Sequence, residues 1–398
     1  MDSKEIISAA DIFFAKINEN TIWIFVNLTL SNGIEGWGEA TLNKKEKLIY
    51  ELAKIKLPQL VGLTLNELSL KLKVDCLLDN IPNAVFYSAV NSAFIDLIAK
   101  NKNISLANHI GFQKNFEIDL YANFNRRTRD RSLRGIKKST EFVRDHGFNA
   151  YKFAPFDEVF PTQSKLDFHK SLTTGLKRID VIKNIIGNEA KLMIDCHWRF
   201  KEQFIDILIQ ELTHFDIYWL ECPILENVNS SNIIKSIRHK TNKKGIKLAG
   251  LETCITKSDF DPFLKDGSYD VVMPDVKYVG GPIKMLEIAN YAKKYGSEFS
   301  PHNPSGPICH AHSLQICGVT ALPVILEHQF DESPYFNELV SNDLPLIKNS
   351  KIKLSNDPGI GVKINKNLNI LKMENNFKTK NKTKNVFANI ADLSSQDN

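Results

Sequence analysis

Three acidic residues in the second half of the chain each end a short apolar run. Asp195 follows Leu-Met-Ile, Glu221 follows Tyr-Trp-Leu, and Glu252 follows Ala-Gly-Leu. They are 26 and 31 residues apart, about one strand-helix unit each, so we expect them to meet at one edge of a parallel sheet. Carboxylates about 4 Å apart repel each other by roughly 4 kcal/mol per pair at an effective dielectric of 20. A divalent cation offsets this repulsion best, and an all-oxygen ligand set favours Mg²⁺, or Mn²⁺, over zinc.

A further acid and a histidine follow the next two apolar runs. Asp275 in Met-Pro-Asp and His302 in Ser-Pro-His are 27 residues apart. A carboxylate on a neighbouring strand can hold an imidazole in one tautomer and raise its basicity, as a general base requires. Glu327 ends the last apolar run and Lys152 lies in an early one, so both are expected beside the same pocket.

A second histidine accompanies the first of the three acids. His197 comes two residues after Asp195, and side chains alternate along a strand, so both are expected to face one spot while Cys196 points away. Cys196 and Cys222 are therefore expected to pack in the core.

A regular alternation of apolar strands and amphipathic helices positions these side chains. The predicted strands are 117–123, 150–154, 192–195, 217–221, 247–252, 271–275, 299–302 and 324–327, and helical patterns include 166–186, 204–213, 233–239 and 282–295. Eight such strands predict a closed (β/α)8 barrel over residues 113–345, because a doubly wound open sheet is usually shorter. Catalytic groups of such barrels sit at the carboxyl ends of the strands.

Residues 1–112 predict a separate α+β capping domain. Alternating apolar residues at 7–14 and 21–30, and a short strand at 36–40, indicate antiparallel strands. Helical spacing follows at 44–60 and 65–79, and the strongly apolar stretch 84–99 predicts a buried core helix. Residues 346–373 are expected to return to this domain. The lysine-rich residues 374–398 are expected to be a solvated tail, with a functional basic tail as the alternative.

The composition argues against several classes of function. The chain has 398 residues, of which 43% are hydrophobic and 24% charged, and a net charge of +5, which is typical of a soluble protein of two domains. Its basic residues are scattered, which argues against nucleic-acid binding. Six cysteines without a CxxC pair fit a reducing compartment. No apolar run reaches the roughly 20 residues that span a bilayer and the N-terminus lacks a signal-peptide pattern, so we expect a cytoplasmic protein without membrane association.

Taken in order, these motifs resemble the mandelate racemase/muconate lactonizing enzyme group of the enolase superfamily. Besides the three acids, the resemblance rests on Gly-Trp-Gly-Glu-Ala-Thr-Leu at 36–42, Met-Pro-Asp through Val-Gly-Gly at 273–281 and Pro-His-Asn-Pro-Ser-Gly at 301–306. It covers most of the chain and implies a metal-stabilised enediolate as the intermediate.

The resemblance also implies roles for individual residues. The implied metal ligands are Asp195, Glu221 and Glu252. The implied base is His302 oriented by Asp275, while Glu327 would hydrogen-bond the substrate carboxylate or enolate, with possible help from Lys152. The group also suggests a homo-oligomer, from dimer to octamer.

Two features of the sequence modify this expectation. The group often carries Lys-x-Lys in its second barrel strand, whereas this chain has Lys152-Phe-Ala154, so the second base of a two-lysine racemase is absent. Conversely, His197 resembles the histidine that protonates the departing hydroxyl in acid-sugar dehydratases of the group. The resemblance therefore implies a dehydratase of an aldonate or aldarate. An epimerase, racemase or cycloisomerase acting through the same enolate, and a non-catalytic acid-sugar sensor, are the alternatives.

The capping loop that closes over substrate in the group is short here, at 16–20. Enclosure is expected from residues 42–44, from a neighbouring subunit, or from the cationic loop 123–131, for which a solvated surface loop is the alternative. Guanidinium groups suit carboxylates, so Arg126 and Arg127 of this loop are candidate substrate-binding residues. Asn123 and Asn125 of the same loop are the other candidates. Trp198 either lines the pocket or caps the barrel.

Overall fold

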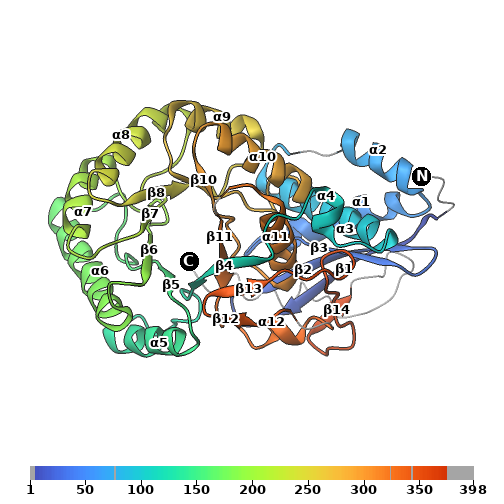
Figure 1. The fold of residues 1–398 in the computed structure, drawn as a ribbon, viewed down its shortest axis with the longest axis horizontal. Coiled ribbons are helices and arrows are strands. Elements are labelled where there is room, and N and C mark those ends of the chain that lie inside the picture. The colour runs from blue at the N-terminus through green and yellow to red at the C-terminus, as the bar shows by residue number, and fades with distance from the viewer. Residues whose placement is uncertain (1–4, 76–77, 323, 342–343, 374–398) are drawn as a thin grey trace.

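The computed structural model describes residues 5–75, 78–322, 324–341 and 344–373. The predicted tail at 374–398 lies outside these residues. Within them the chain forms a barrel of alternating strands and helices beside a smaller α+β capping domain (Figure 1). This is the α/β architecture that the sequence predicts, a (β/α)8-type barrel with an N-terminal capping domain.

The capping domain is built on a four-stranded antiparallel sheet in the order β14-β1-β2-β3. Its strands are β1 (Ile7–Lys16), β2 (Ile22–Leu30), β3 (Glu35–Glu39) and β14 (Leu371–Met373). Its helices are α1 (Glu46–Lys56), the short 3-10 helix Leu57–Leu60, α2 (Leu65–Asp75), α3 (Ile81–Asn101) and α4 (Leu106–Ile110). Helix α3 packs against β2 and β3, and the apolar side chains of this domain form a core separate from that of the barrel.

Helix α3 packs closely against β3. A β-carbon at Gly38 would lie 1.9 Å from the carbonyl oxygen of Ala89, so only glycine permits this approach. The prediction that no apolar run is long enough to cross a membrane needs correction, because α3 meets that test by length and composition. However, 67% of its most apolar window is buried in the structure, as is typical of a core helix.

Eight parallel strands form the barrel. They are β4 (Glu117–Asn123), β5 (Ala150–Phe153), β6 (Lys191–Asp195), β7 (Trp219–Glu221), β8 (Lys247–Gly250), β9 (Val271–Val272), β10 (Glu298–Phe299) and β11 (Ile325–Gln329). Each pairs with the next along the chain, β11 pairs with β4, and a bridge between Phe299 and Val324 joins β10 to the last strand. The sheet therefore closes on itself.

Helices surround the barrel and cover its outer face (Figure 1). They are α5 (Leu133–Asp145), α6 (Lys165–Ile186), α7 (Ile205–Leu212), α8 (Ser231–Asn242), α9 (Lys257–Asp266), α10 (Pro282–Lys294) and α11 (Pro307–Val319), with 3-10 turns at Glu202–Phe204 and Val228–Ser230. The main core lies between strands and helices and includes Cys196, as expected from its direction. Cys222 is also fully buried.

Several predicted boundaries differ from the structure, and two of these differences affect the site and the domain division. Strands β8, β9 and β10 end before Glu252, Asp275 and His302, which therefore lie on the loops that follow these strands. The return to the capping domain also starts later than residue 346, because β12 (Ile347–Lys348) pairs with β13 (Lys351–Lys353), and β13 pairs with barrel strand β4. A short helix α12 (Tyr335–Glu338) precedes them, and β14 joins the capping sheet by pairing with β1.

Candidate active site

The three acids predicted to bind metal lie together at the barrel mouth. Asp195 and Glu221 end β6 and β7 and are directly paired across these strands, and Glu252 lies two residues beyond β8. Their exposed fractions are 3%, 0% and 7%. Because buried carboxylates are unfavourable without positive partners, this cluster requires a cation.

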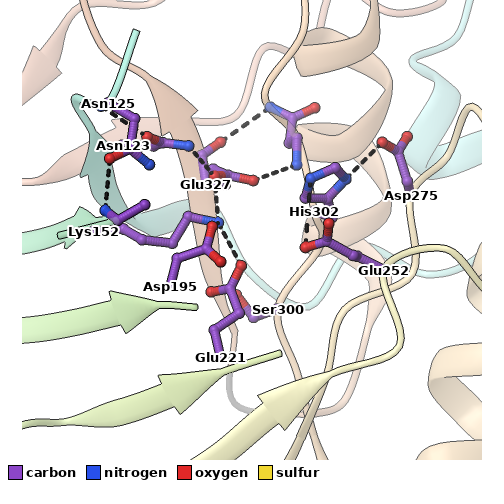
Figure 2. Close-up of polar contacts among 12 residues, drawn as sticks. Asn123, Asn125, Lys152, Asp195, Glu221, Glu252, Asp275, Ser300, His302 and Glu327 are labelled. Carbon is purple, nitrogen blue, oxygen red and sulfur yellow. Dashed lines mark hydrogen bonds and ion pairs between the residues drawn. The ribbon is translucent and has the colours of Figure 1, made fainter. Parts of the chain in front are cut away.

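Lys152 on β5 supplies one positive charge. Its Nζ lies 2.7 Å from an oxygen of Glu221, 2.7 Å from one of Glu327 and 3.9 Å from one of Asp195 (Figure 2). Burial by itself lowers the pKa of Lys152, but the charges of Glu221 and Glu327 outweigh burial and hold that pKa well above its usual value. These carboxylates favour the protonated form of Lys152 in the metal-free protein.

One ammonium group does not neutralise the cluster. Burial raises the pKa of Glu221, and the charges of Asp195 and Glu252 add to this effect against the opposing charge of Lys152, so that the pKa reaches about 8. A carboxyl group whose pKa is raised by neighbouring carboxylates, and an all-oxygen donor set, fit a hard divalent cation such as Mg²⁺.

Each of the three acids contacts a different basic side chain in the structure. Glu221 contacts Lys152, an oxygen of Asp195 lies 2.9 Å from His197 Nε2, and an oxygen of Glu252 lies 3.7 Å from His302 Nε2. Accordingly, within the described residues no three acidic, histidine or cysteine side chains form a finished metal-binding cluster. The assignment of the three acids as metal ligands stays a prediction.

His302 and Asp275 form a hydrogen-bonded pair. Nδ1 of His302 lies 2.9 Å from an oxygen of Asp275, which is fully buried, and the other oxygen of Asp275 accepts a hydrogen bond from the backbone N–H of Lys277 at 2.8 Å. Figure 2 shows Asp275 and Glu252 on the two nitrogen sides of the His302 ring. A carboxylate on Nδ1 leaves Nε2 as the nitrogen that can exchange a proton with a ligand.

We expect His302 to titrate far above the ordinary histidine value in the metal-free protein. Burial lowers its pKa, but the charges of Glu252 and Glu327 and the bond to Asp275 outweigh burial and raise the pKa to about 9. A pH titration of the metal-free protein, followed by NMR of the His302 ring, should give a midpoint near 9. The same titration of Glu252→Gln should give a lower midpoint. A wild-type midpoint at or below about 6.5 would contradict this explanation.

His197 faces Asp195 for a different reason than strand alternation. β6 ends at Asp195, and His197 and Trp198 have left-handed backbone conformations with φ of 47° and 55°. This turn brings the imidazole back to Asp195, whose charge raises the pKa of His197 more than burial lowers it. His197 is therefore favoured in its protonated form and remains 44% exposed, so it can donate a proton to a ligand.

A cavity of about 310 Å³ lies above these groups. It is lined by Thr41, Leu42, Asn43, Asn123, Asn125, Arg126, Lys152, Asp195, His197, Glu252, Lys277, Tyr278, His302 and Pro304. Both histidines, two of the predicted metal ligands and Lys152 thus face one space. Residues 41–43 of the capping domain and the loop after β4 contribute to its wall, which agrees with two of the three expected sources of enclosure.

Three of the five candidate substrate-binding residues line this cavity. These are Asn123, Asn125 and Arg126. Arg127 does not line it, because its guanidinium stacks over Phe142 at 3.8 Å and pairs with Asp331 at 2.9 Å on the outside of the barrel. Trp198 does not line it either.

The sequence reasoning missed Lys277 and Tyr278. Lys277 is 5% exposed, lines the cavity, and places its Nζ 3.4 Å from an oxygen of Asp275 and 3.5 Å from the carbonyl oxygen of Thr41. It connects the His302–Asp275 pair to the capping domain. Its position two residues after a predicted functional acid was the signal that could have identified it.

We expect Lys277→Met to destabilise the protein by about 3 kcal/mol, because removing one partner of a buried ion pair leaves the other charge uncompensated. Urea denaturation should show this loss. Lys284→Met is the matched control, since Lys284 is 57% exposed and pairs with Glu287 at the surface. Equal, small effects of both substitutions would mean that Lys277 does not stabilise Asp275.

Comparison with known families explains this arrangement. Residues 12–111 match the N-terminal domain model of mandelate racemase / muconate lactonizing enzyme, and residues 136–368 match the model for an enolase C-terminal domain-like fold. The chain belongs to the enolase superfamily. Within it, both matches place the chain in the mandelate racemase/muconate lactonizing enzyme group. Membership of this superfamily implies a divalent metal.

Among curated members of the superfamily, the chain is similar to sugar-acid enzymes. It is 23% identical to D-xylonate dehydratase of Haloferax volcanii over 88% of this chain and 85% of that protein. It is 22% identical to D-galactonate dehydratase of Pectobacterium atrosepticum over 89% of this chain and 91% of that protein.

Solved structures of the superfamily share the fold. A protein from Zymomonas mobilis ZM4, assigned as a dehydratase, has a TM-score of 0.81 at 20% identity over 91% of this chain and 97% of its own. A protein from Burkholderia xenovorans LB400, assigned as an L-alanine-DL-glutamate epimerase and bound to magnesium and fumarate, has a TM-score of 0.76 at 19% identity. The match covers 90% of this chain and 94% of that one.

Proposed function

We propose that the protein is a Mg²⁺-dependent dehydratase whose substrate is an aldonate. One observation carries the proposal: His302, paired with Asp275, and His197, paired with Asp195, face the same cavity, which gives one candidate base and one candidate acid. The similar D-xylonate and D-galactonate dehydratases support the same class of substrate.

In the proposed reaction the residues have separate tasks. Asp195, Glu221 and Glu252 would hold the cation, which when bound stabilises negative charge on the substrate carboxylate. Nε2 of His302 would take the proton from the carbon next to that carboxylate, while Asp275 holds Nδ1. Lys152, fixed by Glu221 and Glu327, would stabilise the enediolate oxygens.

The elimination step would use His197. It would donate its proton to the hydroxyl group on the β-carbon as the bond between that carbon and oxygen breaks, so that water leaves. The enol that remains gains a proton at the β-carbon and becomes a 2-keto-3-deoxy acid. Dehydration thus needs one base and one acid, which His302 and His197 would supply.

Epimerisation would need proton delivery from another group to the opposite side of the same carbon. The position that could carry a second lysine is Ala154, which cannot donate a proton, and Lys152 is held between Glu221 and Glu327. This favours elimination over epimerisation or cycloisomerisation.

The charges around the cavity favour an aldonate over an aldarate. Arg126 bonds at 3.1 Å to the largely buried Glu332, which also accepts a bond from Thr21, and Lys277 pairs with Asp275. Besides Lys152, the lysine and arginine side chains that line the cavity among the described residues are Lys277 and Arg126. Each of these two is already paired with a carboxylate of the protein. A second substrate carboxylate would add unmatched negative charge, whereas the hydroxyl groups of an aldonate suit the neighbouring asparagines.

The test is a panel of aldonates and the aldarates of matching stereochemistry, incubated with purified protein and Mg²⁺ and assayed for 2-keto acid. We expect turnover of at least one aldonate, and slower turnover of its aldarate. Turnover of aldarates alone would contradict the choice of substrate. Mg²⁺-dependent binding without turnover would support a sensor and contradict the proposal.

A further inference from the structure

The loops that follow β6, β7 and β8 contain an unusual concentration of left-handed backbone. His197, Trp198, Cys222 and Leu251 have φ values of 47°, 55°, 44° and 73°. This conformation is unfavourable for residues other than glycine and persists only where surrounding contacts hold it. Cys222 and Leu251 are next in sequence to the proposed metal ligands Glu221 and Glu252, and His197 is the proposed acid. The contacts that hold these turns therefore also set the geometry of the site.

Glu226, in the loop after β7, contacts two of these turns. Its Oε2 accepts a hydrogen bond from Trp198 Nε1 at 3.1 Å, and its Oε1 accepts one from the backbone N–H of Leu251 at 2.7 Å. The hydroxyl group of Tyr269 donates a third bond to Oε1 at 2.6 Å. One carboxylate thereby joins the turn that carries His197 to the turn that carries Glu252.

The space around this carboxylate is closely fitted. A β-carbon at Gly250, the last residue of β8, would lie 2.4 Å from Oε1 of Glu226 and 2.7 Å from Cε1 of Tyr269. The absence of a side chain at Gly250 therefore leaves room for the Glu226 carboxylate and the Tyr269 ring.

We infer that Glu226 is a positioning residue that fixes the loop of Glu252 and the loop of His197 relative to each other, and thereby sets the affinity of the site for its divalent cation. Glu226 does not line the cavity, so it acts through the two turns and not on a ligand. The part that concerns His197 rests on the proposed function, whereas the part that concerns the cation can be measured without any substrate.

The experiment is calorimetric titration of Mg²⁺ into purified full-length protein and its variants. Glu226→Ala removes all three acceptor contacts and should weaken Mg²⁺ binding about 10- to 100-fold, as is typical when partners that support metal ligands are lost. Glu226→Gln keeps an oxygen for Leu251 and Tyr269, so its affinity should lie between those of wild type and Glu226→Ala.

Glu158→Ala is the matched control. Glu158 also accepts two hydrogen bonds from one partner, Arg178, but in the loop after β5, away from the three acids. Its loss should leave Mg²⁺ affinity unchanged. The inference is overturned if folded Glu226→Ala binds Mg²⁺ as tightly as wild type, or if Glu158→Ala weakens binding equally.

Trp198→Phe keeps the inference testable if Glu226→Ala does not fold. It removes only the donor on the His197 side and leaves the bonds from Leu251 and Tyr269, so we expect Mg²⁺ affinity to fall less than in Glu226→Ala, and a several-fold lower rate of water loss on an active aldonate. An unchanged rate would overturn the link to His197. If no aldonate is turned over by wild type, the proposed function fails, while the Mg²⁺ titrations of the Glu226 variants still decide the role of Glu226.

Discussion

Replacing His302 with asparagine is expected to reduce removal of the α-proton by about 10²- to 10⁴-fold, the range usual for loss of a general base. Asparagine can retain a hydrogen bond to Asp275 but cannot accept a proton at this position. The measurement is NMR of an active aldonate in D₂O, which follows both deuterium at the α-carbon and formation of the 2-keto acid.

Two features of the structure support the size of this effect. His302 lines the cavity and its Nδ1 is held by the fully buried Asp275, whereas Glu221 and Glu327 favour the protonated form of Lys152. His169→Asn on α6 is the control, because this side chain is exposed and outside the cavity. If His302→Asn kept more than a tenth of the wild-type rate, another group would have to be the base.

Replacing His197 with asparagine is expected to separate the two halves of the reaction. Loss of the acid should slow water loss by about 10²- to 10⁴-fold, while His302 can still remove the α-proton and return deuterium from solvent. NMR in D₂O should therefore show deuterated substrate that accumulates without a corresponding amount of 2-keto product.

A control is required because His197 contacts Asp195 at 2.9 Å. Mg²⁺ affinity of His197→Asn should be measured by calorimetry, and only a variant that still binds Mg²⁺ tests the role of the imidazole as acid. Dehydration at the wild-type rate by such a variant would remove His197 from the mechanism.

The barrel and the convergence of its acids could be predicted because both follow from local patterns. All eight predicted strands are present, and the paired positions of Asp195 and Glu221 result from the parallel register of β6 and β7. The carboxyl ends of parallel barrel strands meet at one mouth whatever the loops do. Spacing alone therefore placed Asp275 near His302.

The details of the loops could not be predicted in the same way. His197 faces Asp195 through a left-handed turn that strand alternation does not describe. The contacts of Lys277 with Thr41 and of Glu226 with Trp198 join residues distant in sequence, and no local pattern encodes them. Two neighbouring arginines also diverge, since Arg126 lines the cavity whereas Arg127 stacks on Phe142.

The most direct test of the central proposal, elimination from an aldonate, is NMR of the wild-type reaction in D₂O with Mg²⁺. We predict a 2-keto-3-deoxy acid that carries deuterium from solvent at its C3 position, and α-deuterium in the remaining substrate only as a minor product. Recovered substrate that gains deuterium at the α-carbon, with inverted configuration and no loss of water, would contradict elimination and indicate epimerisation.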